Sequence, residues 1–170
     1  RVGTKQRGGI YQLTDLFTLF YLKHQRQMNG DAHYWRNTLN TPKQNTWYGL
    51  AFENVCLLHH QQVITALHLD SIHTDFYAWR SKESSPAVQI DMVIDRADGI
   101  VNIVEIKYSK DLYTLKKSEY DKIVHREAAF REETNTKKGV QIVIISTNGI
   151  VKNVYANEVS NMLDINDLFL

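Results

Sequence analysis

The chain has 170 residues, of which 43% are hydrophobic and 23% charged, a composition that predicts an ordinary soluble globular fold. Residues 1–11 lack the pattern of a signal peptide, and no apolar run approaches the ~20 residues that a membrane-spanning helix needs. We therefore expect a cytoplasmic protein with no membrane partner. The single cysteine, Cys56, excludes an internal disulfide and a multi-cysteine zinc site.

The net charge of +1 is unevenly distributed. Residues 1–50 contain seven Lys or Arg and two Asp or Glu, whereas residues 51–170 contain thirteen and seventeen. A basic first segment suits contact with a phosphate backbone, and a scatter of solvated side chains explains it equally well.

Residues 1–46 are predicted to be a segment separate from the rest of the chain. The sequence does not begin with Met, and its first residues resemble the end of a hairpin, so we expect a part of a longer protein. Residues 11–13 suggest a short strand, and Thr14 or Asp15 is expected to cap a helix that ends near Gln27. Large apolar residues on nearly all sides of that helix suggest burial between two units. The polar residues 29–46 are the predicted boundary, with Trp35 as a packing anchor.

Residues 47–170 are predicted to form one α/β domain. Hydrophobic periodicity and turn residues predict a helix at 47–67, strands at 74–79, 88–95 and 100–108, a helix at 112–133, strands at 141–146 and 151–156, and a closing helical turn at 165–170, with a turn at 82–86. The order α-β-β-β-α-β-β describes a mixed sheet flanked by helices. Residues 141–146 are almost entirely apolar, which is typical of a strand covered on both faces.

Three charged residues interrupt the second and third of these strands. Asp91 lies between large apolar residues, and Glu105 and Lys107 alternate with apolar residues on the next strand. Because strand side chains alternate between faces, Glu105 and Lys107 project together. Charged side chains among large apolar side chains are costly to bury unless they are paired with opposite charges or bind a ligand such as a metal ion.

The turn between these strands decides whether Asp91 joins the other two. A two-residue loop, Asp98-Gly99, would place Asp91 opposite Ile106 and on the wrong face. A three-residue loop beginning at Ala97, with Gly99 in the left-handed conformation, would place Asp91 opposite Glu105. The position of the glycine favours the second arrangement.

Two carboxylates and a lysine on one face of the sheet suit phosphodiester hydrolysis. Asp91, Glu105 and the backbone carbonyl of Ile106 would supply oxygen ligands to Mg²⁺ or Mn²⁺. Lys107 would orient the attacking water and offset developing negative charge. Glu53, on the preceding helix, would add a carboxylate if that helix packs over the hairpin, and a helix-surface glutamate is an equal alternative.

The alternative for Asp91, Glu105 and Lys107 is a structural ion pair. Asp95 shares the face of Asp91 and is explained most simply by turn chemistry. The basic residues of the helix at 112–133 could follow a phosphate backbone or form a solvated face; they are Lys116, Lys117, Lys122, Arg126 and Arg131. The seven histidines show no metal-ligand spacing.

The residues from Asp91 to Glu105-Ile106-Lys107 resemble the PD-(D/E)xK nuclease signature, and the element order is similar to its αβββαβ core. Residues 47–53, the Thr147-Asn148-Gly149 turn and the ending Asp167-Leu168-Phe169 resemble the C-terminal part of bacterial and archaeal AAA-type ATPases. In those proteins a nuclease-like domain follows a winged-helix segment. The residue before Asp91 is Ile90, a departure from the proline of the signature.

The resemblance implies a restriction-endonuclease-like fold at residues 47–170, preceded by a linker and the end of a winged-helix-like segment at 1–46. It implies a Mg²⁺- or Mn²⁺-dependent nuclease with DNA as substrate and an upstream ATPase domain as partner. No GxxxxGK[ST] motif occurs here, so ATP hydrolysis would belong to that upstream domain. The competing hypothesis is a non-catalytic module that binds nucleic acid or protein.

Overall fold

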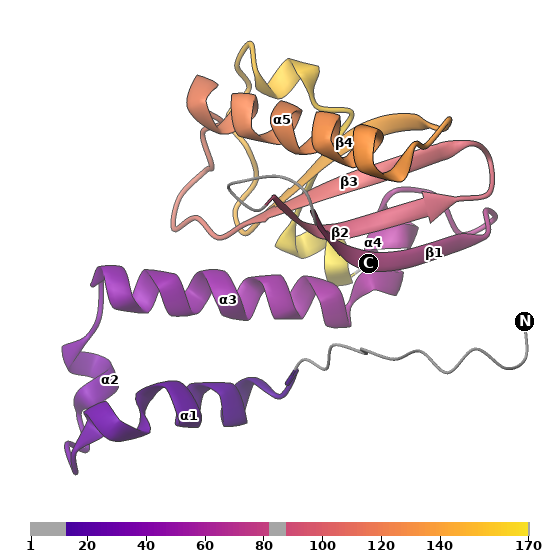
Figure 1. Cartoon of the computed structure of the whole chain (residues 1–170). Coiled ribbons are helices and arrows are strands. Elements are labelled where there is room, and N and C mark those ends of the chain that lie inside the picture. The colour runs from indigo at the N-terminus through magenta and orange to yellow at the C-terminus, as the bar shows by residue number, and fades with distance from the viewer. Residues whose placement is uncertain (1–12, 82–87, 170) are drawn as a thin grey trace, which may run out of the picture. The chain divides into compact units, whose positions relative to one another are not determined.

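The computed structural model describes residues 13–81 and 88–169 (Figure 1). The predicted strand at residues 11–13 and the predicted turn at 82–86 fall largely outside these residues. The chain forms two compact units, Arg1–Trp47 and Tyr48–Leu170, divided one residue from the predicted boundary. No helix in the described part of the chain is both long and apolar enough to cross a bilayer.

The first unit contains α1 (Leu16–Met28), α2 (Tyr34–Asn37) and the beginning of α3 (Pro42–Leu58). Asp15 caps α1, as predicted, and its carboxylate accepts a 2.6 Å hydrogen bond from the Thr18 amide. Asn29 ends α1 with a left-handed φ of 42°. The prediction of a loop throughout residues 29–46 is wrong, because α2 and the first turn of α3 lie within it.

An aromatic cluster holds the first unit together. His24 is fully buried against Phe20, Trp35 and Trp47, and its Nδ1 lies 3.0 Å from the Tyr34 hydroxyl. Trp35 is therefore a packing anchor, as predicted. Burial lowers the pKa of His24. Among the described residues, Phe17 and Leu22 of α1 are 77% and 62% exposed, and the predicted burial of this helix between two units stays a prediction.

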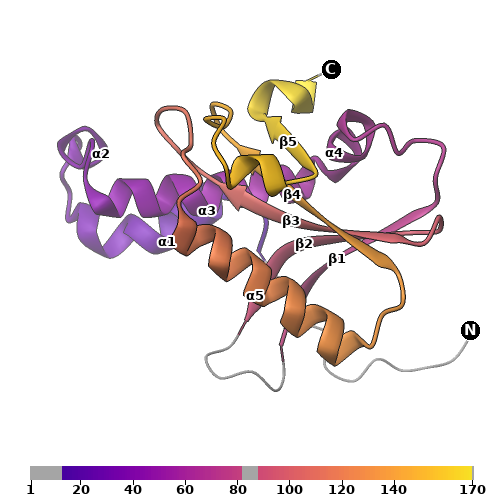
Figure 2. The same cartoon turned by 90° about the horizontal axis from the view of Figure 1, so that it is seen from above.

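The second unit is built on a five-stranded mixed sheet in the order β1-β2-β3-β4-β5 (Figure 2). The strands are β1 (Thr74–Arg80), β2 (Gln89–Arg96), β3 (Ile100–Lys107), β4 (Gly139–Ser146) and β5 (Asn161–Asp164). The first three are antiparallel neighbours, and β4 and β5 continue the sheet in parallel with β3. This topology confirms the predicted α/β class with a mixed sheet.

Helices cover both faces of the sheet. One face is covered by the second part of α3, by α4 (His60–Ala66) and by the closing 3₁₀ turn η2 (Ile165–Phe169). Their buried residues pack on Met92, Val104 and Val143 of the sheet. On the other face, Ile123 and Phe130 of α5 (Lys117–Thr134) contribute to the core. Burial on both faces explains why β4 is apolar, as its sequence predicted.

Several element bounds differ from the prediction. The helix expected at 47–67 begins at Pro42 and is divided into α3 and α4, and α5 begins at Lys117 rather than at 112. The strand expected at 151–156 is wrong. There, the side-chain oxygen of Asn153 accepts hydrogen bonds from the amides of Tyr155 and Ala156, which starts the 3₁₀ turn η1 (Ala156–Glu158), and β5 follows it. Ile150 and Tyr155 still reach the core from this loop.

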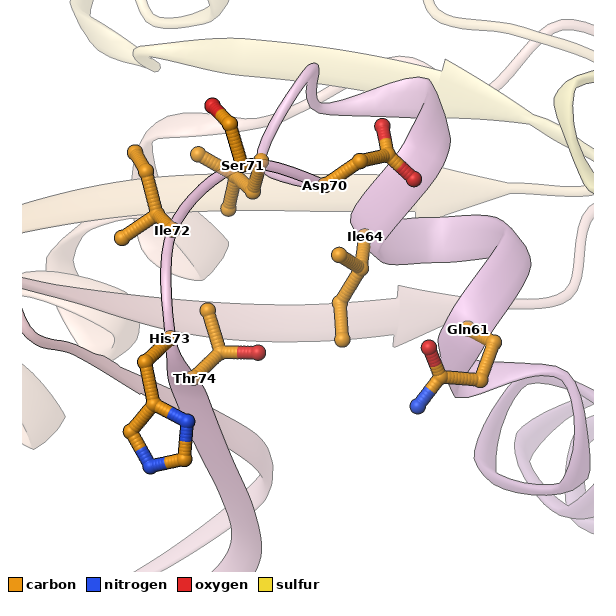
Figure 3. A pocket seen from close by; sticks show the side chains of 8 residues that line it. Gln61, Ile64, Asp70, Ser71, Ile72, His73 and Thr74 are labelled. Carbon is orange, nitrogen blue, oxygen red and sulfur yellow. The ribbon is translucent and has the colours of Figure 1, made fainter.

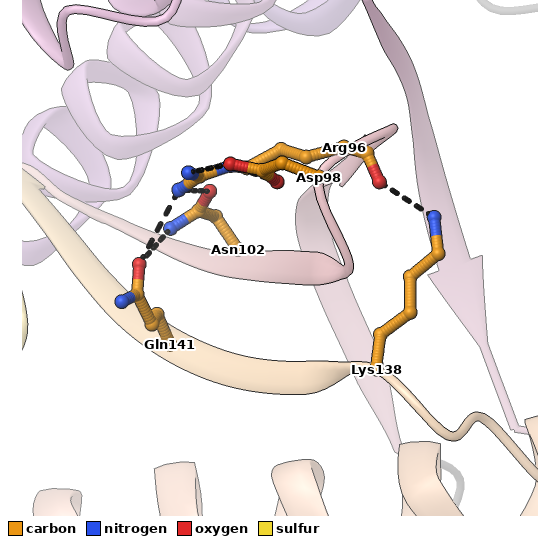
Figure 4. A network of polar contacts seen from close by, with 5 residues as sticks. All are labelled: Arg96, Asp98, Asn102, Lys138 and Gln141. Atoms are coloured by element: carbon orange, nitrogen blue, oxygen red, sulfur yellow. Dashed lines mark hydrogen bonds and ion pairs between the residues drawn. The ribbon is translucent and has the colours of Figure 1, made fainter. Parts of the chain in front are cut away.

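The turn end of the β2–β3 hairpin is fixed by a polar network (Figure 4). Arg96 forms an ion pair with Asp98, and its guanidinium also donates to the side chains of Asn102 and Gln141, both at 3.4 Å. Lys138 donates a 2.6 Å hydrogen bond to the Arg96 carbonyl and forms a 2.5 Å ion pair with Asp95. Every charge of this network therefore has an opposite partner.

Candidate metal-binding and catalytic site

The register of β2 and β3 brings Asp91 to Glu105. Met92 pairs with Val104 and Asp95 with Val101, which leaves a three-residue loop at 97–99 with Gly99 at φ 88°. The predicted odd-numbered loop and left-handed glycine are thus confirmed. The same register continued by one residue places Asp91 opposite Glu105. The amide of Ile106 donates a 3.3 Å hydrogen bond to Asp91 Oδ2, which ties the carboxylate to β3.

Asp91 is a half-buried carboxylate in an unfavourable electrostatic environment. Burial raises its pKa, and the negative charge of Glu105 raises it further. The hydrogen bond from Ile106 and the cations Lys107 and Arg126 act in the opposite direction but do not offset these effects. Within residues 13–81 and 88–169, Asp91 forms no ion pair at 4.0 Å or less, unlike Asp95 on the same strand.

Glu105 is the most deeply buried charged residue of the site, with a side chain that is 4% exposed. One of its carboxylate oxygens lies 2.5 Å from the Lys107 ammonium, and the other pairs with the Arg126 guanidinium from α5. The two cations are more accessible, at 32% and 28%. Glu105 and Lys107 thus form an ion pair, whereas Asp91 takes no part in it.

Glu53 joins the same group of charges from α3. Burial raises its pKa, and Asp91 and Glu105 raise it further, whereas Lys107 lowers it. These charges act on Glu53 because α3 packs over the hairpin, with Phe52 and Cys56 in one core cluster with Met92 and Val104. The structure thus gathers Glu53, Asp91, Glu105 and Lys107 at one end of β2 and β3, and the peptide of Ile106 lies beside them.

A small pocket of about 100 Å³ opens beside Glu105. From β3 it is lined by Glu105 and Lys107, and from α5 by Glu119, Lys122, Ile123 and Arg126. The α5 residues are spaced by three or four positions, so they share one face of the helix. Near this face, burial and the carboxylates of Glu119 and Glu105 raise the pKa of Tyr113.

Arg126 is the site residue that the sequence prediction did not separate from its neighbours. The five basic residues of this helix were expected to act together, either as a solvated face or along a phosphate backbone. The structure divides them: Lys117 and Arg131 form exposed ion pairs with Asp121 and Glu127, whereas Arg126 turns toward Glu105. The signal in the sequence is spacing, since Arg126 lies three residues after the buried Ile123 and four before the buried Phe130.

The Thr147-Asn148-Gly149 turn holds the segment that follows Lys107. The Thr147 hydroxyl accepts a 2.9 Å hydrogen bond from the Ser109 amide, and the Thr147 amide donates to the Lys107 carbonyl at 3.3 Å. The Asn148 side chain donates to the carbonyls of Ser109 and Lys110. Gly149 has a φ of 82°, which permits the reversal. The ends of β3 and β4 are thus fastened together beside the site.

Four further residues of the second unit are engaged in a hydrogen bond, an ion pair or core packing. Gln89 accepts a 2.8 Å hydrogen bond from Arg80 at the exposed strand end, and Asp95 pairs with Lys138. Cys56 is buried in the core, which raises the pKa of its thiol to about 12. Trp79 packs on Phe130 with ring centroids 5.4 Å apart.

A larger hollow of about 340 Å³ lies at the start of β1 (Figure 3). Its lining comes from α4, the following loop and β1, and includes Gln61, Asp70, Ser71 and His73. Thr65 donates a 2.6 Å hydrogen bond to Asp70 at its border. None of Glu53, Asp91, Glu105 and Lys107 lines this hollow, so it is separate from the charged site.

The donor atoms of the site fit a hard divalent cation. Carboxylate oxygens are the ligands that Mg²⁺ and Mn²⁺ prefer. Burial and, to a smaller extent, neighbouring carboxylates raise the pKa values of Glu53 and Asp91, and a bound cation would favour their charged forms. In the described part of the chain, no three His, Cys, Asp or Glu side chains already converge in positions to hold a metal. Glu105 instead uses its oxygens for Lys107 and Arg126.

Comparison with known protein families finds no matching family model, and comparison with curated proteins finds no relative. Among solved structures, the chain is similar to one described as "Protein of Unknown Function AF1548", with 19% sequence identity and a TM-score of 0.44. The match covers 65% of this chain and 64% of that chain, less than two thirds of its length. The fold class given above comes from the strand order and register and does not depend on this likeness.

Proposed function

We propose that the second unit is a Mg²⁺- or Mn²⁺-dependent nuclease domain that hydrolyses phosphodiester bonds of DNA. The observation that supports the proposal is the register of β2 and β3, which brings together Asp91, Glu105 and Lys107, the residues that resemble the PD-(D/E)xK signature. A restriction-endonuclease-like core and a cytoplasmic location are parts of the same proposal.

Asp91, Glu105 and the carbonyl of Ile106 would hold the cation, which supplies Lewis acidity toward the phosphoryl oxygen and the leaving oxygen. Lys107, already adjacent to Glu105, orients the attacking water and stabilises negative charge in the transition state. The raised pKa of Glu53 makes its carboxylate better suited than an ordinary glutamate to accept a proton from that water.

The electrostatic cost of the site supports a functional role. Burial and neighbouring negative charge raise the pKa values of Asp91 and Glu53, so the environment of both groups disfavours their charged form. Groups perturbed by burial and by a charged neighbour are concentrated at functional sites. A purely structural pair of Glu105 with Lys107 would not need Asp91 or Glu53 nearby.

The test is DNA cleavage by the chain with single- and double-stranded substrates, in Mg²⁺, in Mn²⁺ and in chelator. Asp91→Asn is the variant, and Asp95→Asn is its control on the same strand. We expect cleavage in metal by the native sequence and by Asp95→Asn, and none by Asp91→Asn. Cleavage that persists in Asp91→Asn would contradict the proposal. DNA binding without cleavage in either metal would favour the non-catalytic binding module.

We further propose that this domain works as the C-terminal part of a larger AAA-type ATPase, with residues 1–46 as the linker. The resemblance of the 47–53, 147–149 and 167–169 segments supports this assignment. ATP-stimulated cleavage by a longer protein that contains both parts would test it. Equal cleavage with and without ATP would contradict a coupling between them.

A further inference from the structure

Arg126 is placed between two possible partners. Its guanidinium pairs with Glu105, while its side chain also lines the pocket shared with Lys107 and Lys122. It remains 28% exposed, so solvent and ligands can reach it, whereas the Glu105 side chain is 4% exposed. The charge that Arg126 compensates is the same carboxylate that the proposed function assigns to the cation.

We infer that Arg126 is a displaceable partner of Glu105. In the cation-free protein the Arg126 guanidinium pairs with the Glu105 carboxylate. When a divalent cation binds to Glu105, the guanidinium turns to a phosphate of the nucleic-acid backbone in the adjacent pocket. The inference rests on the proposed function, because it requires Glu105 to be a metal ligand. It adds a phosphate subsite formed by Arg126 and Lys122, which the sequence prediction did not contain.

Competition for one carboxylate is the physical reason for the exchange. A divalent cation and a guanidinium both bind carboxylate oxygens, and the two positive groups repel each other if they share Glu105. Arg126 is long and partly accessible, so it can leave without unfolding α5. Its buried neighbours Ile123 and Phe130 keep the helix in place.

The pocket suits a phosphate once Glu105 is neutralised by the cation. Lys107, Lys122 and Arg126 then face a single remaining carboxylate, that of Glu119. A guanidinium binds a phosphate through two parallel hydrogen bonds, whereas an ammonium acts as a point charge. Among the residues that the structure describes, no aromatic ring lines this pocket, so we expect contact with the backbone rather than with bases. We therefore expect a sequence-independent contact with a polynucleotide.

The experiment compares Arg126→Gln with two control variants. Lys122→Gln alters the pocket at a residue that forms no ion pair with Glu105. Arg131→Gln alters an exposed ion pair of the same helix. Calorimetry measures Mn²⁺ binding without nucleic acid. Anisotropy of a labelled oligonucleotide in Ca²⁺ measures nucleic-acid binding over a range of salt concentrations.

For Arg126→Gln we expect Mn²⁺ to bind about fivefold more tightly or better, the lower end of typical coupling between two ligands. The same variant should bind the oligonucleotide more weakly, with a salt slope reduced by about 1. Lys122→Gln should weaken only oligonucleotide binding, and Arg131→Gln should change neither.

Tighter Mn²⁺ binding distinguishes displacement from a structural role, because loss of a residue that merely positions Glu105 would weaken binding. Unchanged or weaker Mn²⁺ binding by Arg126→Gln would overturn the inference while leaving the proposed function intact. Absence of Mn²⁺ binding by the native sequence would instead overturn the proposed function, and the inference with it. If Arg126→Gln does not fold, Arg126→Lys, which keeps the charge but shortens the reach, is expected to shift both affinities in the same directions.

Discussion

The two ends of the β2–β3 hairpin carry similar numbers of charged residues in opposite electrostatic situations. At the turn end, Asp95 pairs with Lys138. Asp98 pairs with Arg96, and the neighbouring amide side chains complete the network (Figure 4). At the other end, Glu53, Asp91 and Glu105 crowd together, and both cations that pair with carboxylates there, Lys107 and Arg126, are on Glu105.

The two ends differ in whether their charges stabilise the fold. At the turn end, the ion pairs close the hairpin and connect it to β4, so the charges compensate one another. At the site end, burial and like charge raise the pKa of two carboxylates, Glu53 and Asp91, and neither forms an ion pair within the described residues. An excess of negative charge that a ligand can relieve is what a cation site requires. Substitutions at the two ends should therefore have contrasting effects.

The largest contrast is expected in metal binding. Glu105→Gln keeps the size of the side chain but removes its charge, so it should abolish Mn²⁺ binding measured by calorimetry. The control Asp95→Gln removes a carboxylate from the turn end and should bind Mn²⁺ like the native chain. Near-normal affinity in Glu105→Gln would place the metal elsewhere.

Cleavage should distinguish Lys107 at the site end of the hairpin from Lys138 at its turn end, each of which pairs with a carboxylate. Lys107→Ala is expected to lower kcat by roughly 10²-fold or more, the effect of losing one electrostatic stabiliser of the transition state. Lys107→Arg should restore little, because a broad guanidinium does not place a point charge beside the water. Lys138→Ala, at the turn end, should cleave normally. Equal losses in Lys107→Ala and Lys138→Ala would show that the effect is structural.

The turn end should respond to backbone strain instead. Gly99 has a φ of 88°, and a Cβ atom added there would meet nothing within 4 Å. Gly99→Ala therefore tests conformation alone and should destabilise the fold by about 1–2 kcal/mol. Denaturant unfolding would measure this change. An unchanged free energy of unfolding would mean that the turn adopts another conformation.

The smallest expected effects are changes in stability on substitution of single carboxylates, and these changes should differ in sign between Asp91 and Asp95. Burial and Glu105 raise the pKa of Asp91 above its ordinary 3.8 in the folded state. The folded protein then binds protons more readily than the unfolded chain, so this group lowers stability as pH rises from near 3.8 through the raised folded pKa. Asp91→Asn should flatten that decline and leave the protein at least as stable at neutral pH.

Asp95→Asn should have the opposite effect at neutral pH, because it breaks the partly exposed pair with Lys138. Its cost should be at most about 1 kcal/mol. Melting temperatures of both variants and the native chain, measured across this pH range without metal, would check the two signs. Destabilisation of the same size in both variants at neutral pH would show that the two ends do not differ.

Much of the site followed from local sequence rules. Alternation along a strand placed Glu105 and Lys107 on one face, and the Ala97-Asp98-Gly99 loop fixed the register that brings Asp91 to them. Both rules depend only on residues close in sequence, so they can be applied without knowledge of the tertiary structure. The helix cap at Asp15 and the apolar strand β4 were predictable for the same reason.

Other features were decided by contacts between distant segments. The sequence at 151–156 has the apolar content of a strand, but the core accepts Ile150 and Tyr155 from a loop, and β5 forms later from Asn161–Asp164. The spacing of Arg126 from Ile123 and Phe130 places it near the inner side of the helix, but it does not identify the partner, Glu105, which lies 21 residues away. The sequence by itself therefore determined the class of fold and the chemical groups of the site. Tertiary packing decided their charge balance, since that depends on which side chains α3 and α5 bring to the end of the hairpin.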